Sequence, residues 1–189
     1  MMKLGLGIFG LLLATNGWAA SSSYVIDSRH TFPVFEVSHY GFSLQRGRFG
    51  KVTGTLVLDH ETNRGSIEVV IDTASIDMGF DEWSKQMRGE RFFQVEKFPS
   101  ATFVARDFAL VADRPSMVAG ELSLLGTTRP VLVEVTRWRC ARHPMLPREL
   151  CGADIQATIR RSEFGMGYGT PGIADEVRLA IPIEAIREQ

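Results

Sequence analysis

Residues 118–136 read VAGELSLLGTTRPVLVEVT, and they contain two runs in which an apolar residue or glycine occupies every second position. These positions are Val118, Gly120, Leu122 and Leu124 in the first run and Val131, Val133 and Val135 in the second. A period of two places such residues on one face of a β-strand. Between the runs, Gly126-Thr127-Thr128 is a turn signal. The stretch therefore predicts two strands joined by a short turn, each with one buried face.

The same alternation recurs along most of the chain, in the ranges 34–39, 66–72, 155–160 and 177–184. Two more segments, 49–59 and 101–110, are rich in β-branched and aromatic residues, and turn signals lie at 63–65 and 113–115. Eight strands with short connections predict an all-β antiparallel meander, which is either a barrel or a sandwich.

One segment departs from this pattern. In residues 81–88, Trp83 and Met87 are four apart, Asp81 is a candidate cap and Gly89 follows as a stop, which predicts a short amphipathic helix. The aromatic residues Phe92 and Phe93 come next. Because this segment lies between strands, it either closes one mouth of a barrel or is a connector packed on the outside.

Composition excludes several classes of protein. The chain has 189 residues, 21 basic and 22 acidic, and 44% of its residues are hydrophobic. No net positive field exists to attract nucleic acid, and the apolar content is too high for a disordered chain. Two cysteines are too few for a disulfide-rich miniature fold.

The N-terminus has the three parts of a secretory signal peptide. Lys3 precedes an apolar run over 4–14, and Gly17 and Ala19 provide small residues at the −3 and −1 positions. The run is too short to span about 30 Å of hydrocarbon as an anchor. We therefore expect residues 1–19 to be a signal peptide and 20–189 to be one exported domain.

Cys140 and Cys151 enclose ten residues. In an oxidising compartment two free thiols tend to pair, and this spacing lacks the Cys-X-X-Cys form of a redox pair. We predict a structural disulfide.

The sequence shows little catalytic or metal-binding chemistry. It contains four histidines, His30, His39, His60 and His143, without the spacings of a metal cluster, so we expect no metal and no catalytic residues. Gly165, Gly167 and Gly169 precede Pro171 rather than a helix, which is typical of a turn and not of a phosphate loop.

What remains is an apolar interior. An eight-stranded barrel has room for packed side chains or for one slender ligand. The chain has twelve phenylalanines and only three tyrosines, and an interior lined by phenylalanine favours hydrocarbon over water. A long alkyl or isoprenoid chain is the ligand that such an interior suits.

Several motifs, in order along residues 24–186, resemble the YceI family of exported, lipid-binding barrel proteins. The motifs that carry the resemblance are Tyr24-Val25-Ile26-Asp27, His30-Thr31, Arg46-Gly47-Arg48-Phe49, Phe92-Phe93, Phe98-Pro99, Ala101-Thr102-Phe103, Gly120-Glu121-Leu122-Ser123-Leu124, Arg129-Pro130-Val131 and Arg161-Ser162-Glu163-Phe164-Gly165-Met166.

The resemblance implies a lipocalin-like eight-stranded antiparallel barrel with a short helix near one mouth, located in the periplasm. It also implies a polyisoprenoid, an isoprenoid quinone or another long-chain amphiphile in the lumen, with no further cofactor and no general catalytic activity. We expect the ligand to contact Phe35, Val37, Phe49, Ile67, Val69, Ile71, Phe103 and Leu122, with Trp83, Met87, Phe92 and Phe93 at the mouth and His39 as a polar contact to the head group.

Three functions follow from this interpretation. The leading hypothesis is an exported carrier of an isoprenoid lipid, which touches membranes only transiently for ligand exchange. The second is a hydrolase of a lipid-linked substrate, and the third is a protein-interaction module with a structural lipid. No feature selects an oligomeric state, and a homodimer stays an open alternative.

Overall fold

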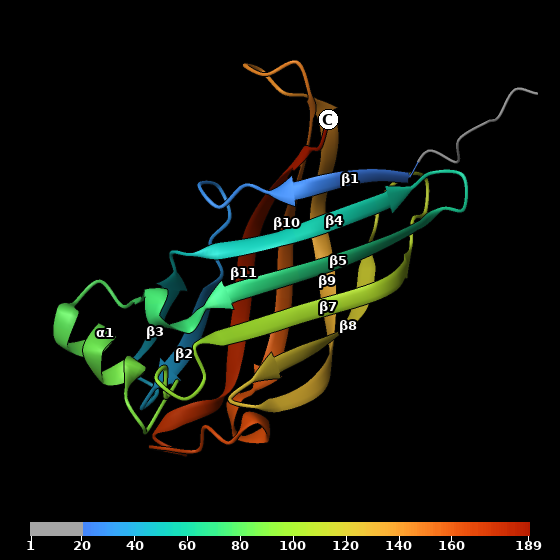
Figure 1. Ribbon diagram of the computed structural model, residues 1–189. Coiled ribbons are helices and arrows are strands. Elements are labelled where there is room, and N and C mark those ends of the chain that lie inside the picture. The colour runs from blue at the N-terminus through green and yellow to red at the C-terminus, as the bar shows by residue number, and fades with distance from the viewer. Residues whose placement is uncertain (1–20) are drawn as a thin grey trace, which may run out of the picture.

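The computed structural model describes residues 21–189, and strands dominate it (Figure 1). The predicted signal peptide lies outside the described residues. The elements are β1 Ser21–Ile26, β2 Val34–His39, β3 Ser43–Phe49, β4 Val52–Asp59, β5 Arg64–Asp72, η1 Thr73–Ser75, β6 Ile76–Asp77, α1 Asp81–Arg88, β7 Ser100–Ala109, β8 Met117–Leu124, β9 Thr127–Arg142, β10 Glu149–Arg160, η2 Arg161–Phe164 and β11 Ile173–Arg187.

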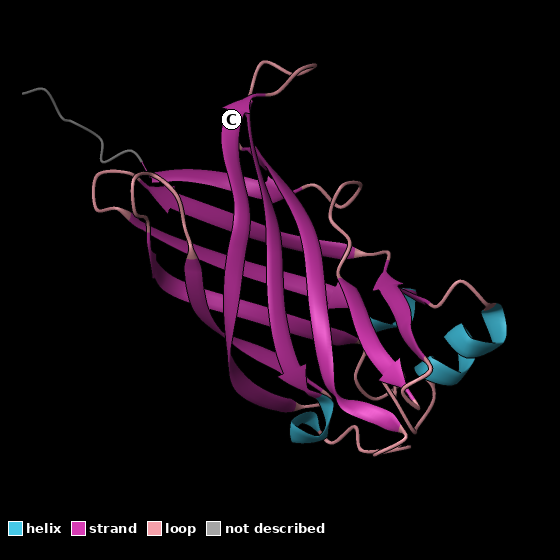
Figure 2. Cartoon of the chain, turned by 180° about the vertical axis from the view of Figure 1, so that it is seen from behind, coloured by secondary structure: helices cyan, strands magenta, loops and turns pink. Residues whose placement is uncertain are grey.

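Eight of the strands form a closed antiparallel barrel. Their order is β1-β4-β5-β7-β8-β9-β10-β11, and β11 pairs again with β1, for example at Val25 and Ile186 (Figures 1 and 2). Closure satisfies the edges that an open sheet would leave unpaired. The predicted barrel is therefore confirmed, and the sandwich alternative is wrong because one continuous sheet encloses the core.

Three further strands extend this barrel at one end. The long strand β11 pairs with β1 near its C-terminus and with β2 near its N-terminus, where Val177 lies opposite Val37. Strand β3 pairs with β2, and the short β6 pairs with β3. As a result the wall is taller on the side formed by β2, β3 and β6.

The strand predicted within 49–59 is confirmed as β4, but it begins at Val52 and not at Phe49. Strand β3 ends at Phe49 and β4 begins at Val52, because the residues between them bond elsewhere. The backbone N–H of Gly50 donates to the carbonyl oxygen of Ser75 at 3.2 Å, and the N–H of Lys51 donates to Ser75 Oγ at 3.1 Å. These bonds replace the ladder and bend the chain where the barrel wall is extended.

The helix α1 spans the predicted residues and lies at one end of the barrel (Figures 1 and 2). The predicted cap at Asp81 is wrong, since Phe80 is the N-cap residue and makes no side-chain capping bond. Ser84, one turn into the helix, instead accepts a hydrogen bond from the backbone N–H of Met78 at 3.0 Å. This bond ties the helix to the residue that follows β6. Among the described residues, no helix is long and apolar enough to cross a membrane.

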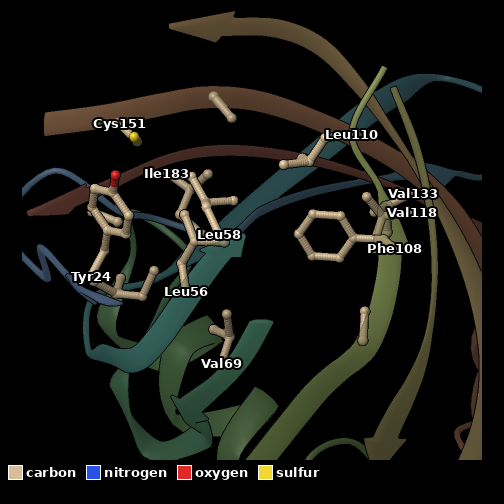
Figure 3. Packing of buried hydrophobic residues seen from close by; sticks show 14 of the residues in the cluster. Tyr24, Leu56, Leu58, Val69, Phe108, Leu110, Val118, Val133, Cys151 and Ile183 are labelled. Atoms are coloured by element: carbon tan, nitrogen blue, oxygen red, sulfur yellow. The ribbon is translucent and has the colours of Figure 1, made fainter. Parts of the chain in front are cut away.

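The buried side chains form two clusters, one toward each end of the barrel. The closed-end cluster, shown in part in Figure 3, consists of Tyr24, Ile26, Val52, Leu56, Leu58, Val69, Ala105, Phe108, Leu110, Val118, Val133, Cys151, Ala153, Ile183 and Ala185. The open-end cluster, on the side of α1, consists of Phe35, Phe49, Ile76, Phe92, Phe93, Ala101, Leu122, Leu124, Leu125, Phe164, Met166 and Val177.

The predicted disulfide is present. Cys140 on β9 lies directly opposite Cys151 on β10, and their sulfur atoms are bonded. The bond closes the hairpin whose tip projects from the closed end (Figure 1). It therefore joins two strands that already pair, close to where the hairpin leaves the barrel.

Candidate functional site

An internal cavity of about 400 Å³ runs through the barrel. This volume lies within the range of about 300 to 1,000 Å³ that is usual for small-molecule pockets. Every side chain that the sequence predicts as a ligand contact lines it: Phe35, Val37, His39, Phe49, Ile67, Val69, Ile71, Trp83, Met87, Phe92, Phe93, Phe103 and Leu122. The structure thus brings all of these residues to one cavity, while their contact with a ligand stays a prediction.

One wall of the cavity, opposite the predicted contact residues, was not identified from the sequence. It comes from the inward faces of β9, β10 and β11, which add aliphatic side chains such as Val133, Ile155 and Leu179. The signal was present, because these residues belong to the alternating runs from which the strands were predicted. The alternation did not show that the two walls face each other across a hollow space.

The interior is hollow rather than filled. Ile155, Ile159, Leu179 and Ile181 all line the cavity, yet they are only half-buried, whereas fully packed core side chains lose nearly all contact with a solvent-sized probe. The lining on β11 runs from Val177 to Ala185, which corresponds to about 27 Å at a rise of about 3.4 Å per residue. The cavity is therefore long and suits an extended ligand.

The phenylalanine rings of the cavity lie over glycines on neighbouring strands. Gly47 pairs with Phe35, and a Cβ atom added at Gly47 would collide with the Phe35 ring. An added Cβ at Gly120 would likewise collide with the ring of Phe103. Because these glycines have no side chain, the rings lie flat along the wall and leave the lumen free.

At the open end the rings contact one another. The centroids of Phe49 and Phe93 are 5.3 Å apart in an edge-to-face arrangement, and that of Phe35 lies 6.1 Å from Phe49. Such geometries stabilise aromatic pairs by about 0.5 to 1.5 kcal/mol beyond the area they bury. The surplus of phenylalanine seen in the sequence is thus concentrated around the open half of the cavity.

Polar groups on the cavity wall gather at the same end. His39 and Gln45 come from the β2–β3 hairpin, and Gln86 comes from α1. At the closed end Thr31 is buried and its hydroxyl is already bonded to the backbone of Glu184. An amphiphile would therefore find hydrogen-bonding partners near α1 and hydrocarbon further inside.

Arg161 is buried beside the open end and shapes it. Its guanidinium donates hydrogen bonds to the carbonyl oxygens of Met166, Tyr168, Ile173 and Ala174, at 2.8 to 2.9 Å. Burial lowers the pKa of this group, while the charge of Asp175 opposes the change. The four bonds hold the loop between η2 and β11, a role that sequence analysis did not assign to Arg161.

One grouping outside the cavity contains metal-ligand types. Asp27, His30 and Glu184 bring one ligand atom each to within 4.8 Å of one another. Burial disfavours the Asp27 carboxylate, but hydrogen bonds from His30 and Arg29 outweigh it and lower its pKa, while the bond to Asp27 raises the pKa of His30. His30 Nδ1 lies 2.8 Å from Asp27 Oδ2, so we interpret the grouping as an ion pair that fixes the turn after β1.

Comparison with known proteins agrees with this architecture. The family model of the YceI-like domain matches residues 24–185, which is most of the chain. The protein belongs to the YceI-like family. The resemblance to this family, which the sequence motifs indicated, is therefore confirmed.

Curated relatives of this YceI-like protein match over nearly their whole length. Protein YceI of Salmonella agona is 29% identical over 184 residues, covering 96% of this chain and 95% of that protein. A UPF0312 protein of Yersinia pestis is 30% identical over 187 residues, covering 97% and 96%. The whole barrel, and not one motif, is therefore shared.

Solved structures of other proteins share this fold. BcnA of Burkholderia cenocepacia superimposes with a TM-score of 0.71 at 26% identity, covering 84% of this chain and 98% of that one. A polyisoprenoid binding domain from Saccharophagus degradans superimposes with a TM-score of 0.63 at 18% identity, covering 87% and 98%. At that identity the second comparison shows a common fold.

Proposed function

We propose that this YceI-like protein binds a long-chain isoprenoid lipid, such as a polyisoprenoid or an isoprenoid quinone, inside the barrel and carries it. The observation that supports this most directly is the long cavity lined by apolar side chains from opposite walls of the barrel. Burial of hydrocarbon contributes about 0.8 kcal/mol per methylene before entropic costs. A structural neighbour described as a polyisoprenoid binding domain supports the same ligand class.

The ligand enters the barrel with its hydrocarbon chain first. Its chain extends along β11 toward Ile183, and its head group stays near His39, Gln45 and Gln86 at the open end. His39 is the chosen polar contact because its imidazole lines the cavity within a largely apolar wall. Replacement by alanine is expected to weaken binding of a lipid with a polar head more than binding of the bare hydrocarbon.

We also propose that the protein acts in the periplasm. The predicted leader supports export, and the disulfide between Cys140 and Cys151 is compatible with an oxidising compartment. Fractionation of cells that express the full chain tests this: recovery of a shortened protein in the periplasmic fraction supports it, and recovery of the uncut chain in the cytoplasm contradicts it.

Extraction of the purified protein with organic solvent, followed by mass spectrometry, tests the ligand. We expect about one isoprenoid lipid per chain. The variant Ile155→Trp fills the lumen from β10 and should lose the lipid, whereas Gln156→Trp, one residue along and exposed on the outside, should retain it. A lipid-free protein that takes up no isoprenoid when offered one would contradict the proposal.

The enzymatic alternative makes a different prediction. In a carrier the lipid is released unchanged, so incubation with an isoprenoid diphosphate or ester should leave the compound intact. Hydrolysis that is abolished by His39→Ala, with binding retained, would favour a hydrolase instead.

A further inference from the structure

The exposed aromatic side chains all lie at one end of the barrel. Within residues 21–189 they are Tyr40, Phe42, Phe80, Trp83 and Tyr168, which we call the aromatic rim. Phe42, at the tip of the β2–β3 hairpin, is 92% exposed, which is unusual because phenylalanine is among the residue types most often buried. The exposed apolar residues of the other end, such as Met145 and Leu146, are aliphatic.

The rim is continuous with the wall of the cavity. Within residues 21–189, three of the cavity-lining residues are exposed, namely Trp83, Gln86 and Tyr168, and all three lie at this end. Trp83 packs edge-to-face on Phe80, and Tyr168 packs in the same way on the buried Phe92. The rings therefore form one apolar surface from the lumen to the outside, and the cavity opens within it.

The rim segments are tied to each other. The backbone N–H of Tyr40 donates to the carbonyl oxygen of Gly172 at 2.6 Å, which joins the β2–β3 hairpin to the loop that carries Tyr168. Arg161 holds that loop through four backbone carbonyls. The rings are thus presented by supported backbone rather than by separate loose ends.

The charges beside the rim are largely balanced. Arg46 forms an ion pair with Glu36, and the guanidinium carbon of Arg91 lies 4.8 Å above the ring of Tyr168. Helix α1 carries acidic residues in its first turn and basic residues in its last. Tyrosine and tryptophan favour the boundary between water and hydrocarbon, so this surface complements a neutral lipid interface better than a strongly charged partner.

We propose that the aromatic rim docks on the surface of a lipid bilayer and places the cavity opening against the membrane. This inference rests on the proposed function, since a ligand that is insoluble in water must come from a membrane. Phe42, Phe80 and Trp83 insert at the level of the head groups, and the lipid slides between bilayer and lumen without crossing water.

Flotation of the full protein with phosphatidylcholine vesicles tests the contact. We expect the protein to float, and the double variant Phe42→Ser/Phe80→Ser to reduce the bound fraction about tenfold or more, since burial of each ring contributes roughly tenfold to an affinity. The matched control is Met145→Ser/Leu146→Ser at the opposite end, which should float like the parent. Addition of phosphatidylglycerol or of salt should change little, because the contact is apolar.

A second measurement separates this inference from the function on which it rests. Neither Phe42 nor Phe80 lines the cavity. Uptake of an isoprenoid alcohol added in ethanol, without vesicles, should therefore be the same in the double variant and the parent, while transfer from vesicles should slow about tenfold. Failure of the parent to take up the alcohol would contradict the proposed function, and flotation would still report on the rim.

Several outcomes would overturn the membrane contact. They are a parent that stays unbound, a double variant that floats as well as the parent, and binding that requires phosphatidylglycerol and disappears in salt. Self-association of the parent in the absence of lipid, lost in the double variant, would instead identify the rim as a contact between two copies of this chain.

Discussion

At the closed end of the barrel Tyr24 and Leu58 are 1% and 0% exposed, whereas at the open end Trp83 and Tyr168 each keep 43% of their surface accessible. The first pair fills its end without lining the cavity, and the second pair lines the cavity and reaches the outside. Tyr24 and Leu58 lie on the paired strands β1 and β4, whereas Trp83 lies on α1 and Tyr168 on the loop before β11. The comparison shows that packed barrel strands stabilise the fold, while elements outside the strands surround the opening.

Composition follows the same division. The closed-end cluster is mostly aliphatic, and a disulfide lies beside it. The open-end cluster contains Phe35, Phe49, Phe92, Phe93 and Phe164. Aromatic rings are therefore concentrated toward α1, although side chains of both clusters line the cavity.

The largest expected effect is a difference in unfolding free energy between truncating a packed side chain and truncating one that lines the cavity. Leu58→Ala should lower the free energy of unfolding by about 2 to 5 kcal/mol, because it leaves a new cavity in a packed region. Ile155→Ala removes a similar side chain that already faces the hollow interior, so it should cost less than half as much. Denaturant unfolding of the lipid-free proteins measures both, and equal losses would show that the wall of the cavity at Ile155 is packed as tightly as the region around Leu58.

Removal of the disulfide comes next in size. A cross-link that closes a loop of this length is expected to stabilise the fold by about 3 kcal/mol, chiefly by restricting the unfolded chain. The double variant Cys140→Ala/Cys151→Ala should lose that amount in urea unfolding, and the parent protein under reducing conditions should match it. An unchanged midpoint would show that strand pairing alone secures this hairpin.

The smallest effect concerns Tyr24, whose hydroxyl donates to Glu149 Oε2 at 2.7 Å. Tyr24→Phe removes this bond and should cost about 1 kcal/mol at neutral pH. Burial, and then the bond to Glu149, raises the pKa of Tyr24 to about 12.

The raised pKa of Tyr24 also determines how the stability of the protein changes with pH. An unfolded tyrosine ionises at about pH 10, so the stabilising contribution is complete below that value and is lost as the pH rises toward about 12. The parent protein should therefore lose stability more steeply than Tyr24→Phe across this interval. Parallel slopes in unfolding experiments at several pH values would show that the closed end admits water around the phenol.

Much of the fold is predictable from sequence because its signal is local. Alternation in runs such as Val131 to Thr136 reports which face of a strand is buried, and Asp81 to Arg88 has a helical spacing. The break between β3 and β4 was missed, since its cause is the bond from Lys51 to Ser75, a residue 24 positions away. The cap of α1 was misplaced for a similar reason, since Ser84 bonds backward to Met78.

The candidate site was predicted in part. Every predicted lining residue faces the cavity, and for those on strands the reason is that the inward side of a strand follows from its period. The wall formed by β9 to β11 and the role of Arg161 were not assigned. Arg161 binds carbonyls up to thirteen positions away, and no short motif encodes which loop a buried guanidinium will hold.

The sequence by itself determined most of the strands, the helix, the pairing of the two cysteines and the family, because each depends on neighbouring residues or on motifs in order. Only the tertiary structure decided that side chains from opposite walls leave a cavity along the barrel, and that exposed rings surround its opening near α1. Closure of β11 onto β1 brings together residues more than 150 positions apart, and the volume they enclose depends on all of them at once. A cavity is a property of opposing walls, and a single strand carries the pattern of only one.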